Sequence, residues 1–168
     1  MSSIAWNLTE AISAVHDFKV NGYSATKAGR DGDFRSNRLT VGGYEWEIHY
    51  NPVLGNYRIA FKVVFLGPVR SGSVRASFRC RLMQYSTSHW CDINGNKHEI
   101  YSTAYWRDAS GSKHECKEET VSHNFMFSEE SSRWVGLMKH SDLESNSSIL
   151  ADDSFRVRCV IAVLKDQQ

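Results

Sequence analysis

Two pairs of histidine and cysteine residues are the first candidates for chemistry in this sequence. His89 and Cys91 form one His-x-Cys pair, and His114 and Cys116 form the other. Residues i and i+2 of a β-strand lie on one face, so each pair can present a nitrogen and a sulfur ligand together. Two such pairs on adjacent strands could complete a tetrahedral zinc site. Because the spacing follows no familiar metal module, we expect instead that these residues pack within a β-rich region and that no metal is bound.

Asp152 and Asp153 are adjacent carboxylates that could act as a general acid and a general base. Neighbouring residues of an extended chain point to opposite faces, so such a pair rarely converges on one substrate. We interpret the pair as a turn in which Asp side chains accept hydrogen bonds from backbone N–H groups ahead of the last strand. The sequence also lacks the standard nucleophile, phosphate-binding, dinucleotide-binding and zinc-protease motifs. It therefore predicts neither an enzyme nor a cofactor.

Arginines alternate along two of the predicted strands, a pattern that is typical of the solvated face of a sheet. Lysine and arginine total 20 and aspartate and glutamate total 19, which gives a net charge of +1. This balance argues against a dedicated binder of nucleic acid or of a membrane surface. No apolar run approaches the roughly 18 residues of a membrane helix, and the first residues do not resemble a secretory signal. With four cysteines and no C-x-x-C spacing, we expect free thiols and a location in the cytoplasm or the nucleus.

Most of the chain has the alternation of a half-buried β-strand. In residues 44–51 the even positions are apolar or aromatic and the odd positions are polar, which is a period of two. Residues 57–66 are apolar on both faces in their second half, as in a central strand. Asn94-Gly95 and the DASGS stretch at 108–112 predict two hairpins. Many short strands with frequent turn signals predict an antiparallel sandwich or barrel.

The sequence predicts one helix and a closing strand after it. Residues 131–145 place Trp134, Leu137 and Met138 at helical spacing, and only a turn near residues 9–15 competes with this segment as a second helical feature. In the final strand, residues 155–163, the odd positions are all apolar and the second half is apolar on both faces. That composition predicts a strand in the middle of a sheet, inserted between earlier strands.

Five stretches, taken in order, resemble a MATH domain of the type at the front of plant MATH–BTB proteins. They are FKVNGYSATK (18–27), LTVGGYEWEIHYNP (39–52), SVRASF (73–78), MKHSDLE (138–144) and ILADDSFRVRCVIAV (149–163). The resemblance implies an all-β fold, an eight-stranded antiparallel β-sandwich of the TRAF-C type with one short helix before the last strand. It also implies binding of short, extended, Ser/Thr-containing peptides. In MATH–BTB proteins the BTB domain docks on cullin-3, so the MATH domain selects what is ubiquitinated.

The same resemblance implies a peptide-binding groove. Family aromatics correspond to Phe61, Phe78, Phe125 and Trp134. Animal members carry Lys-Asp-Trp-Gly just before the last of these aromatics, whereas this chain carries Glu130, Ser131, Ser132 and Arg133. We therefore take as candidate groove residues the four aromatics together with Ser131 and Ser132. An aromatic-lined sheet face suits an added extended peptide, but the competing interpretation is that these aromatics fill the core.

The matched stretches divide the chain into a tail (1–8), a MATH-like domain (9–164) and a tail (165–168). The domain carries an insertion relative to the animal pattern within about 84–123. The sequence has no BTB domain, so we expect no direct contact with cullin-3 in the usual way. The expected partners are peptides of substrate proteins and other MATH or MATH–BTB proteins, with no nucleic acid and no membrane. The alternative function is a TRAF-like structural scaffold that oligomerises without a peptide groove.

Overall fold

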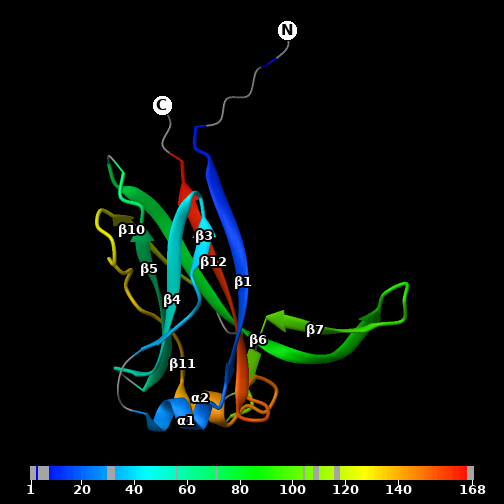
Figure 1. Ribbon diagram of the computed structural model, residues 1–168. Helices are drawn as coiled ribbons and strands as arrows, with labels where there is room; N and C mark the ends of the chain where they lie inside the picture. Colours follow the sequence, from blue (N-terminus) through cyan, green and yellow to red (C-terminus); the bar gives the residue numbers. More distant parts are fainter. Residues whose placement is uncertain are drawn as a thin grey trace.

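The computed structural model describes residues 3, 8–29, 33–55, 57–70, 72–103, 105–107, 110–115 and 118–165. Two antiparallel sheets pack face to face, as the sequence predicted. The first strand begins and the last strand ends at one end of the sandwich, and two short helices lie at the other (Figure 1). The described residues form more than the eight strands that the family resemblance implied, because several short strands and a projecting ribbon are added. No helix among the described residues is long and apolar enough to cross a membrane.

The first sheet has the strand order β1-β12-β6-β10, and β7 pairs with the far part of β6. Its strands are β1 (Ala11–Asn21), β12 (Ser154–Leu164), β6 (Val74–Cys91), β10 (Glu119–Phe125) and β7 (Lys97–Thr103).

The second sheet has the order β11-β5-β4-β2, and β3 also pairs with β4. Its strands are β11 (Val135–Lys139), β5 (Arg58–Gly67), β4 (Tyr44–Leu54), β2 (Phe34–Arg35) and β3 (Leu39–Val41). A separate two-stranded sheet joins β8 (Tyr105–Arg107) to β9 (Lys113–Glu115), which is the second predicted hairpin.

The last strand, β12, lies between β1 and β6, so the prediction of a mid-sheet closing strand is confirmed. It pairs with β1 over that strand's whole length, from Ala11 opposite Leu164 to Asn21 opposite Ser154. Its alternate residues from Phe155 to Val163 are buried, as the period of two requires. This pairing joins the two ends of the chain in one sheet.

The core between the sheets is aromatic. Trp46 is fully buried, and its ring centroid lies 5.1 Å from those of Phe65 and Phe125. Its indole N–H donates to the carbonyl of Val41 at 3.1 Å, so the one polar atom of the side chain is satisfied. Trp46 and Phe65 come from one sheet and Phe125 from the other, so this cluster fastens the two layers together.

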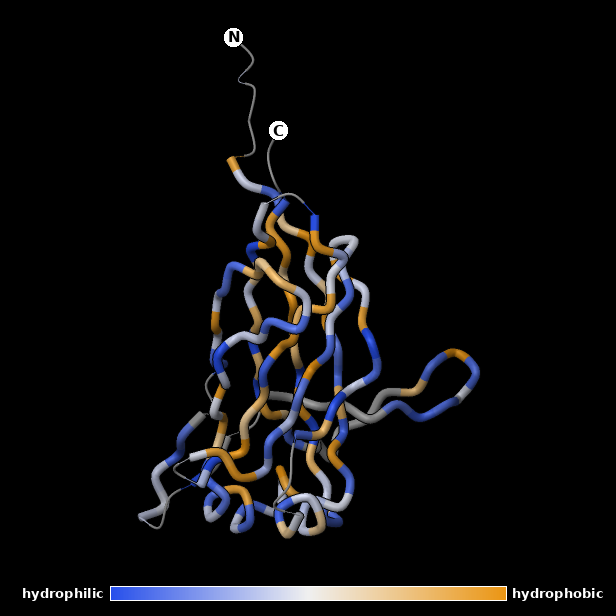
Figure 2. The backbone as a smooth tube through the Cα atoms, turned by 60° about the vertical axis from the view of Figure 1, so that its left-hand side comes forward, coloured by the Kyte–Doolittle hydropathy of each residue, from blue (hydrophilic) through white to orange (hydrophobic). Residues whose placement is uncertain are grey.

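The C-terminal part of β6 and the whole of β7 extend away from the sandwich as a two-stranded ribbon, here called the arm (Figures 1 and 2). Its tip is the predicted Asn-Gly hairpin, in which Gly95 has φ of 80°. The Asp92 carboxylate accepts hydrogen bonds from the backbone N–H groups of Asn94 and Asn96, each at 2.9 Å. Ile93, at the tip, is fully exposed. The arm lies within the segment that the sequence analysis set apart as an insertion.

The structure confirms a short helix before the last strand, but the predicted bounds of 131–145 are too long. Only His140–Glu144 (α2) is helical, and the preceding Val135–Lys139 is the strand β11. A bulge between Gly136 and Met138 shifts the pairing register against β5. Since a bulge adds one residue, Val135 and Met138 are both buried although they are three residues apart. A bulged strand therefore imitated the spacing of a helix.

Two features near the start of the chain also differ from the prediction. Residues 11–15, where a turn was considered, belong to the strand β1. A short helix, α1 (Tyr23–Ala28), follows β1 directly and was not predicted. The left-handed backbone of Gly22, with φ of 70°, allows the abrupt change from strand to helix.

Candidate functional site

Three of the four aromatics predicted to line a groove lie in the core. Phe61, Phe78 and Phe125 are 2%, 1% and 1% exposed, and the Phe61 ring stacks on that of Tyr50 at 5.2 Å. A ring enclosed by the core has no face to offer a ligand, so the structure corrects the prediction of direct peptide contact for these residues. The competing interpretation of the sequence, that these aromatics fill the core, is correct.

Ser132, another predicted groove residue, has a structural role inside the sheet. It is 6% exposed, and its backbone N–H donates to the carbonyl of Val63 at 2.9 Å. Its hydroxyl accepts the N–H of Val63 at 3.1 Å and donates to the carbonyl of Arg133 at 3.0 Å. These bonds engage the Ser132 hydroxyl, so it is not available to a ligand.

Residues 131–139, here called the open edge, follow β5 on one side. Ser131 pairs with Val64 in an isolated bridge, and β11 continues the pairing from Val135 to Lys139. In the part of the chain that the structure describes, β11 is the outermost strand of its sheet. The unpaired side of an edge strand presents N–H and C=O groups that can pair with an extended chain from another protein.

Trp134 lies in the open edge and is half-buried. The ammonium group of Lys62 lies 4.5 Å from the centroid of its ring, which is a cation–π contact. Lys62 also lies 3.6 Å from the carboxylate of Asp33, so its charge is held in place. Of the six predicted groove residues, Trp134 and Ser131 are the two that the structure leaves partly exposed, and they lie on the same segment.

A turn held by Glu130 precedes the open edge. One oxygen of the Glu130 carboxylate accepts the backbone N–H groups of Met126 and Phe127 at 2.6 and 3.2 Å. The other oxygen lies 2.9 Å from a ring nitrogen of His123. The hydrogen bond from His123, with those from the two N–H groups, holds the pKa of Glu130 below its usual range. Met126 and Phe127 are 55% and 67% exposed, so the turn displays two apolar side chains beside the edge.

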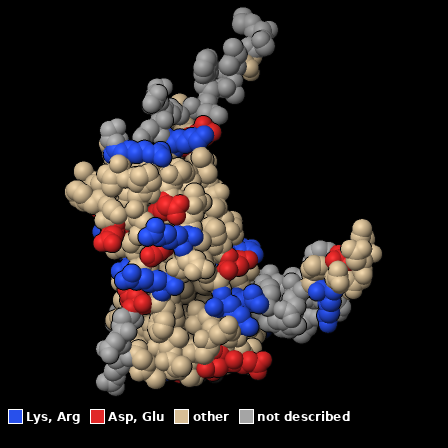
Figure 3. Space-filling view, in the orientation of Figure 1, with Lys and Arg blue, Asp and Glu red and all other residues tan. Residues whose placement is uncertain are grey.

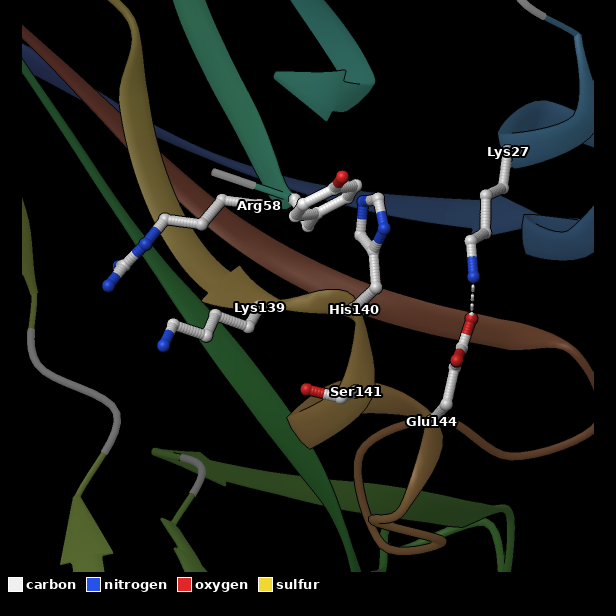
Figure 4. Close-up of a pocket in the computed structure, with 7 residues that line it drawn as sticks. Lys27, Arg58, Lys139, His140, Ser141 and Glu144 are labelled. Carbon is white, nitrogen blue, oxygen red and sulfur yellow. Dashed lines mark hydrogen bonds and ion pairs between the residues drawn. The ribbon is translucent and has the colours of Figure 1, made fainter. Parts of the chain in front are cut away.

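A pocket of about 950 Å³ lies at the other end of the open edge, beside the two short helices (Figure 4). The strands β5 and β11 contribute one side of its lining, and the helices contribute the other. The residues that line it are Lys27, Tyr57, Arg58, Lys139, His140, Ser141 and Glu144.

One side of this pocket is electrically neutralised. The carboxylate of Glu144 forms an ion pair with Lys27 and accepts a hydrogen bond from the hydroxyl of Tyr23 at 3.2 Å. The hydrogen bond from Lys27 is the main reason that the pKa of Glu144 lies below its usual range. Burial raises the pKa of Tyr23, so its hydroxyl stays protonated and donates.

The centre of the pocket is held by His140. Its backbone N–H donates to the carbonyl of Tyr57 at 2.8 Å, and its ring nitrogen Nε2 donates to the carbonyl of Pro52. On the other side of His140, Arg58 and Lys139 are directly opposite partners in the β5–β11 pairing. Sequence reasoning gave these residues no role, because Lys139 and His140 lie in the MKHSDLE stretch whereas Arg58 lies in none of the matched stretches. Only the pairing register brings them together.

The structure describes the side chains of two of the four candidate metal ligands. His114 is exposed on β9 and Cys91 is exposed at the end of β6. Cys116 and the side chain of His89 lie outside the described residues. Within the described part of the chain, no group of three or more histidine, cysteine, aspartate or glutamate residues is placed to hold a metal ion.

The pair Asp152–Asp153 forms a turn, as interpreted from the sequence. Both residues have left-handed backbone, with φ of 52° and 55°. The Asp153 carboxylate accepts the backbone N–H of Ser24 at 3.0 Å and its hydroxyl at 2.7 Å. The hydrogen bonds therefore go to the first helix, α1, and tie it to the start of β12.

No known family model matches the chain. The chain is 27% identical over 167 residues to BTB/POZ and MATH domain-containing protein 3 of Arabidopsis thaliana, which covers 97% of this chain and 36% of that protein. It is 34% identical over 84 residues to BTB/POZ and MATH domain-containing protein 4 of the same plant, which covers 48% of this chain and 18% of that protein. The chain thus spans about a third or less of the length of these relatives. The resemblance to MATH-domain proteins that the sequence motifs indicated is confirmed over nearly the whole chain.

Proposed function

We propose that this chain, which resembles MATH-domain proteins, is a protein-interaction module that holds a short extended segment of a partner protein along the open edge. The observation that carries the proposal is the one-sided pairing of residues 131–139 with β5. Addition of a strand to such an edge supplies main-chain hydrogen bonds for affinity, and neighbouring side chains supply specificity. The proposed activity is binding, not catalysis.

The side chains beside the open edge support a partner segment of mixed chemistry. The half-exposed ring of Trp134 offers a platform for an apolar residue, and the exposed Met126 and Phe127 extend the apolar surface. Ser131 offers a hydroxyl for a serine or threonine of the segment. This arrangement supports binding of the extended, Ser/Thr-containing peptides that the family resemblance implies, with an apolar residue beside the Ser/Thr.

The two relatives carry both BTB/POZ and MATH in their names. We propose by this likeness that the bound segment belongs to proteins that a cullin-3 ubiquitin ligase modifies. The recognition step is assigned to this chain, and the contact with the ligase is assigned to a BTB domain. Co-precipitation of ubiquitinated partners that depends on the open edge would support this role.

The binding proposal is tested by fluorescence anisotropy with a labelled peptide of the pattern Val-Gln-Ser-Ser-Thr flanked by glycines. We expect Trp134→Ala to weaken binding by about tenfold or more, as loss of a central aromatic contact does. Phe34→Ala is the matched control, because Phe34 is a partly exposed aromatic on β2, at the opposite edge of the same sheet. Equal loss in both variants, or no binding by the unaltered chain, would contradict the proposal.

The arm favours a second candidate function, the oligomeric scaffold. A two-stranded ribbon is marginally stable in water on its own, and the exposed Ile93 at the tip adds apolar surface. Contact between copies would cover both. Light scattering over a range of concentrations tests this candidate. A stable oligomer that Ile93→Asp dissociates would support it, and a monomer at every concentration would dismiss it.

A further inference from the structure

Within the part of the chain that the structure describes, the Arg58–Lys139 pair has no counter-charge bound to it. The two residues are directly opposite each other on β5 and β11. Like charges at opposed positions of an antiparallel pair destabilise the sheet. Among the described residues, neither side chain has a hydrogen-bond or ion-pair partner. The sequence therefore keeps two adjacent positive charges that folding does not use.

The acidic residue in the pocket lining does not neutralise them. Figure 4 shows Glu144 on the same side of His140 as Lys27, with the ion pair between them, whereas Arg58 and Lys139 extend on the opposite side. The hydroxyl of Tyr23 also donates to Glu144. An anion that enters on the Arg58 side consequently meets two uncompensated cations.

The stem of Arg58, a residue of the pocket lining, lies beside the backbone of Gly136. A Cβ atom on Gly136 would lie 3.3 Å from Cδ of Arg58, so the glycine provides the room in which the stem of the arginine lies. Ser141 is exposed, and its hydroxyl is directed to the same side of the pocket as Lys139 (Figure 4). A guanidinium fork, an ammonium group and a hydroxyl donor therefore line one side of a single pocket.

We propose that this pocket binds a phosphorylated serine or threonine side chain of a partner polypeptide, an inference that rests on the proposed function for the remainder of the contact. A phosphate ester carries a charge of about −1.5 to −2 at neutral pH, which matches the two uncompensated cations. Guanidinium binds two phosphate oxygens at once, and an ammonium group adds a strong point charge.

The position of the pocket indicates a polypeptide as the source of the phosphate. Ser131 and Lys139 are the two ends of the open edge, so a paired strand between them spans about 26 Å at 3.3 Å per residue. A partner chain that lies along the open edge therefore brings its end to Arg58. The volume of about 950 Å³ also exceeds what a lone phosphate ion fills.

The test compares the peptide of the binding assay with versions that carry one phosphoserine at either end, by calorimetry. In the unaltered chain we expect one phosphorylated version to bind about tenfold or more tightly than the plain peptide. The gain falls below about twofold in Lys139→Glu and in Arg58→Gln. Arg38→Glu, which changes an exposed arginine between β2 and β3, keeps the gain. Absence of a gain at both ends, or a gain that survives in both pocket variants, would overturn the proposal.

A second experiment separates failure of the pocket from failure of the proposed function. N-acetyl-phosphoserine amide is titrated into isotope-labelled protein, and the side-chain N–H signal of Arg58 and the amide signal of Lys139 are followed by NMR. Shifts of both signals uphold the pocket even if the plain peptide does not bind at all, which would count against the open edge alone. Unmoved signals overturn the pocket. Inorganic phosphate that binds as tightly as the phosphopeptide overturns the polypeptide source.

Discussion

The aromatic core and the pocket at the end of the sandwich differ in how their residues are distributed in the sequence. Core residues such as Trp46 and Phe65 recur at alternate positions of long strands, and each ring contacts other rings. Pocket residues such as Lys27 and Lys139 come from separate elements and share no pattern. On the face of the molecule drawn in Figure 3, charges of both signs are interspersed. The comparison indicates that stability resides in the patterned aromatics, whereas the pocket gathers charged residues that only the fold brings together.

The largest expected effect separates a core aromatic from an edge aromatic. Phe78→Ala removes a ring that is 1% exposed, so we expect it to lower the free energy of unfolding by about 3–5 kcal/mol. Trp134→Ala removes a half-buried ring, and its cost is expected to stay below about 2 kcal/mol because less apolar area is lost. Urea denaturation measures both losses of unfolding free energy, provided that the dependence of that free energy on urea concentration keeps the same slope in each variant. A smaller loss for Phe78→Ala than for Trp134→Ala would reverse the comparison.

A smaller effect is expected from the ion pair between Lys27 and Glu144 in the pocket, whose contribution to stability depends on pH. The ion pair with Lys27 lowers the pKa of folded Glu144, so its stabilisation is present above the unfolded pKa of about 4.3 and is lost as pH falls through the folded value. Both side chains are more than a third exposed, so solvent screening limits the contribution to below about 1 kcal/mol.

The measurement is the difference in unfolding free energy between the unaltered chain and Glu144→Gln at several pH values. We expect the unaltered chain to be more stable at pH 7 and the difference to shrink toward zero near pH 3. A difference that grows on acidification would contradict the assignment. Phe78→Ala is the control, because the loss of a core ring does not involve a titrating group.

The smallest expected effect is a gain in stability, whereas the substitutions above lower stability. Lys139→Glu replaces a like-charge cross-strand pair with an attractive one, so we expect stability to rise by about 0.2–1 kcal/mol. The gain should decrease as salt is added, since exposed charges are screened. Thermal unfolding at low and high ionic strength measures it. A loss of stability at low salt would mean that Lys139 has a structural role.

The sandwich itself was predictable because strand period and turn chemistry are local. Alternation placed residues 155–163 in the middle of a sheet, and Asn94-Gly95 marked a hairpin. The bulge at Gly136–Met138 was not predictable, because it depends on how β11 pairs with β5. A bulged strand and a helix give the same three-residue spacing of buried side chains over so short a segment.

The candidate site was predictable only in part. The resemblance pointed to the segment that forms the open edge, since Ser131 and Trp134 lie on it. It did not separate aromatics that pack in the core, such as Phe61 and Phe125, from aromatics that reach the surface. Phe61 and Phe125 lie within strands and face the opposing sheet, whereas Trp134 precedes β11, and the resemblance carries no sign of this difference.

Hydrogen exchange of the backbone amides, with and without the Ser/Thr-containing peptide, tests the central claim most directly. Strand addition forms new hydrogen bonds to the outward-facing amides of residues 131–139, so the account predicts slower exchange in this segment when the peptide is present. Residues of β2, the opposite edge of the same sheet, should exchange at the same rate in both samples. Protection confined to the arm, or saturating peptide that leaves residues 131–139 unprotected, would contradict the account.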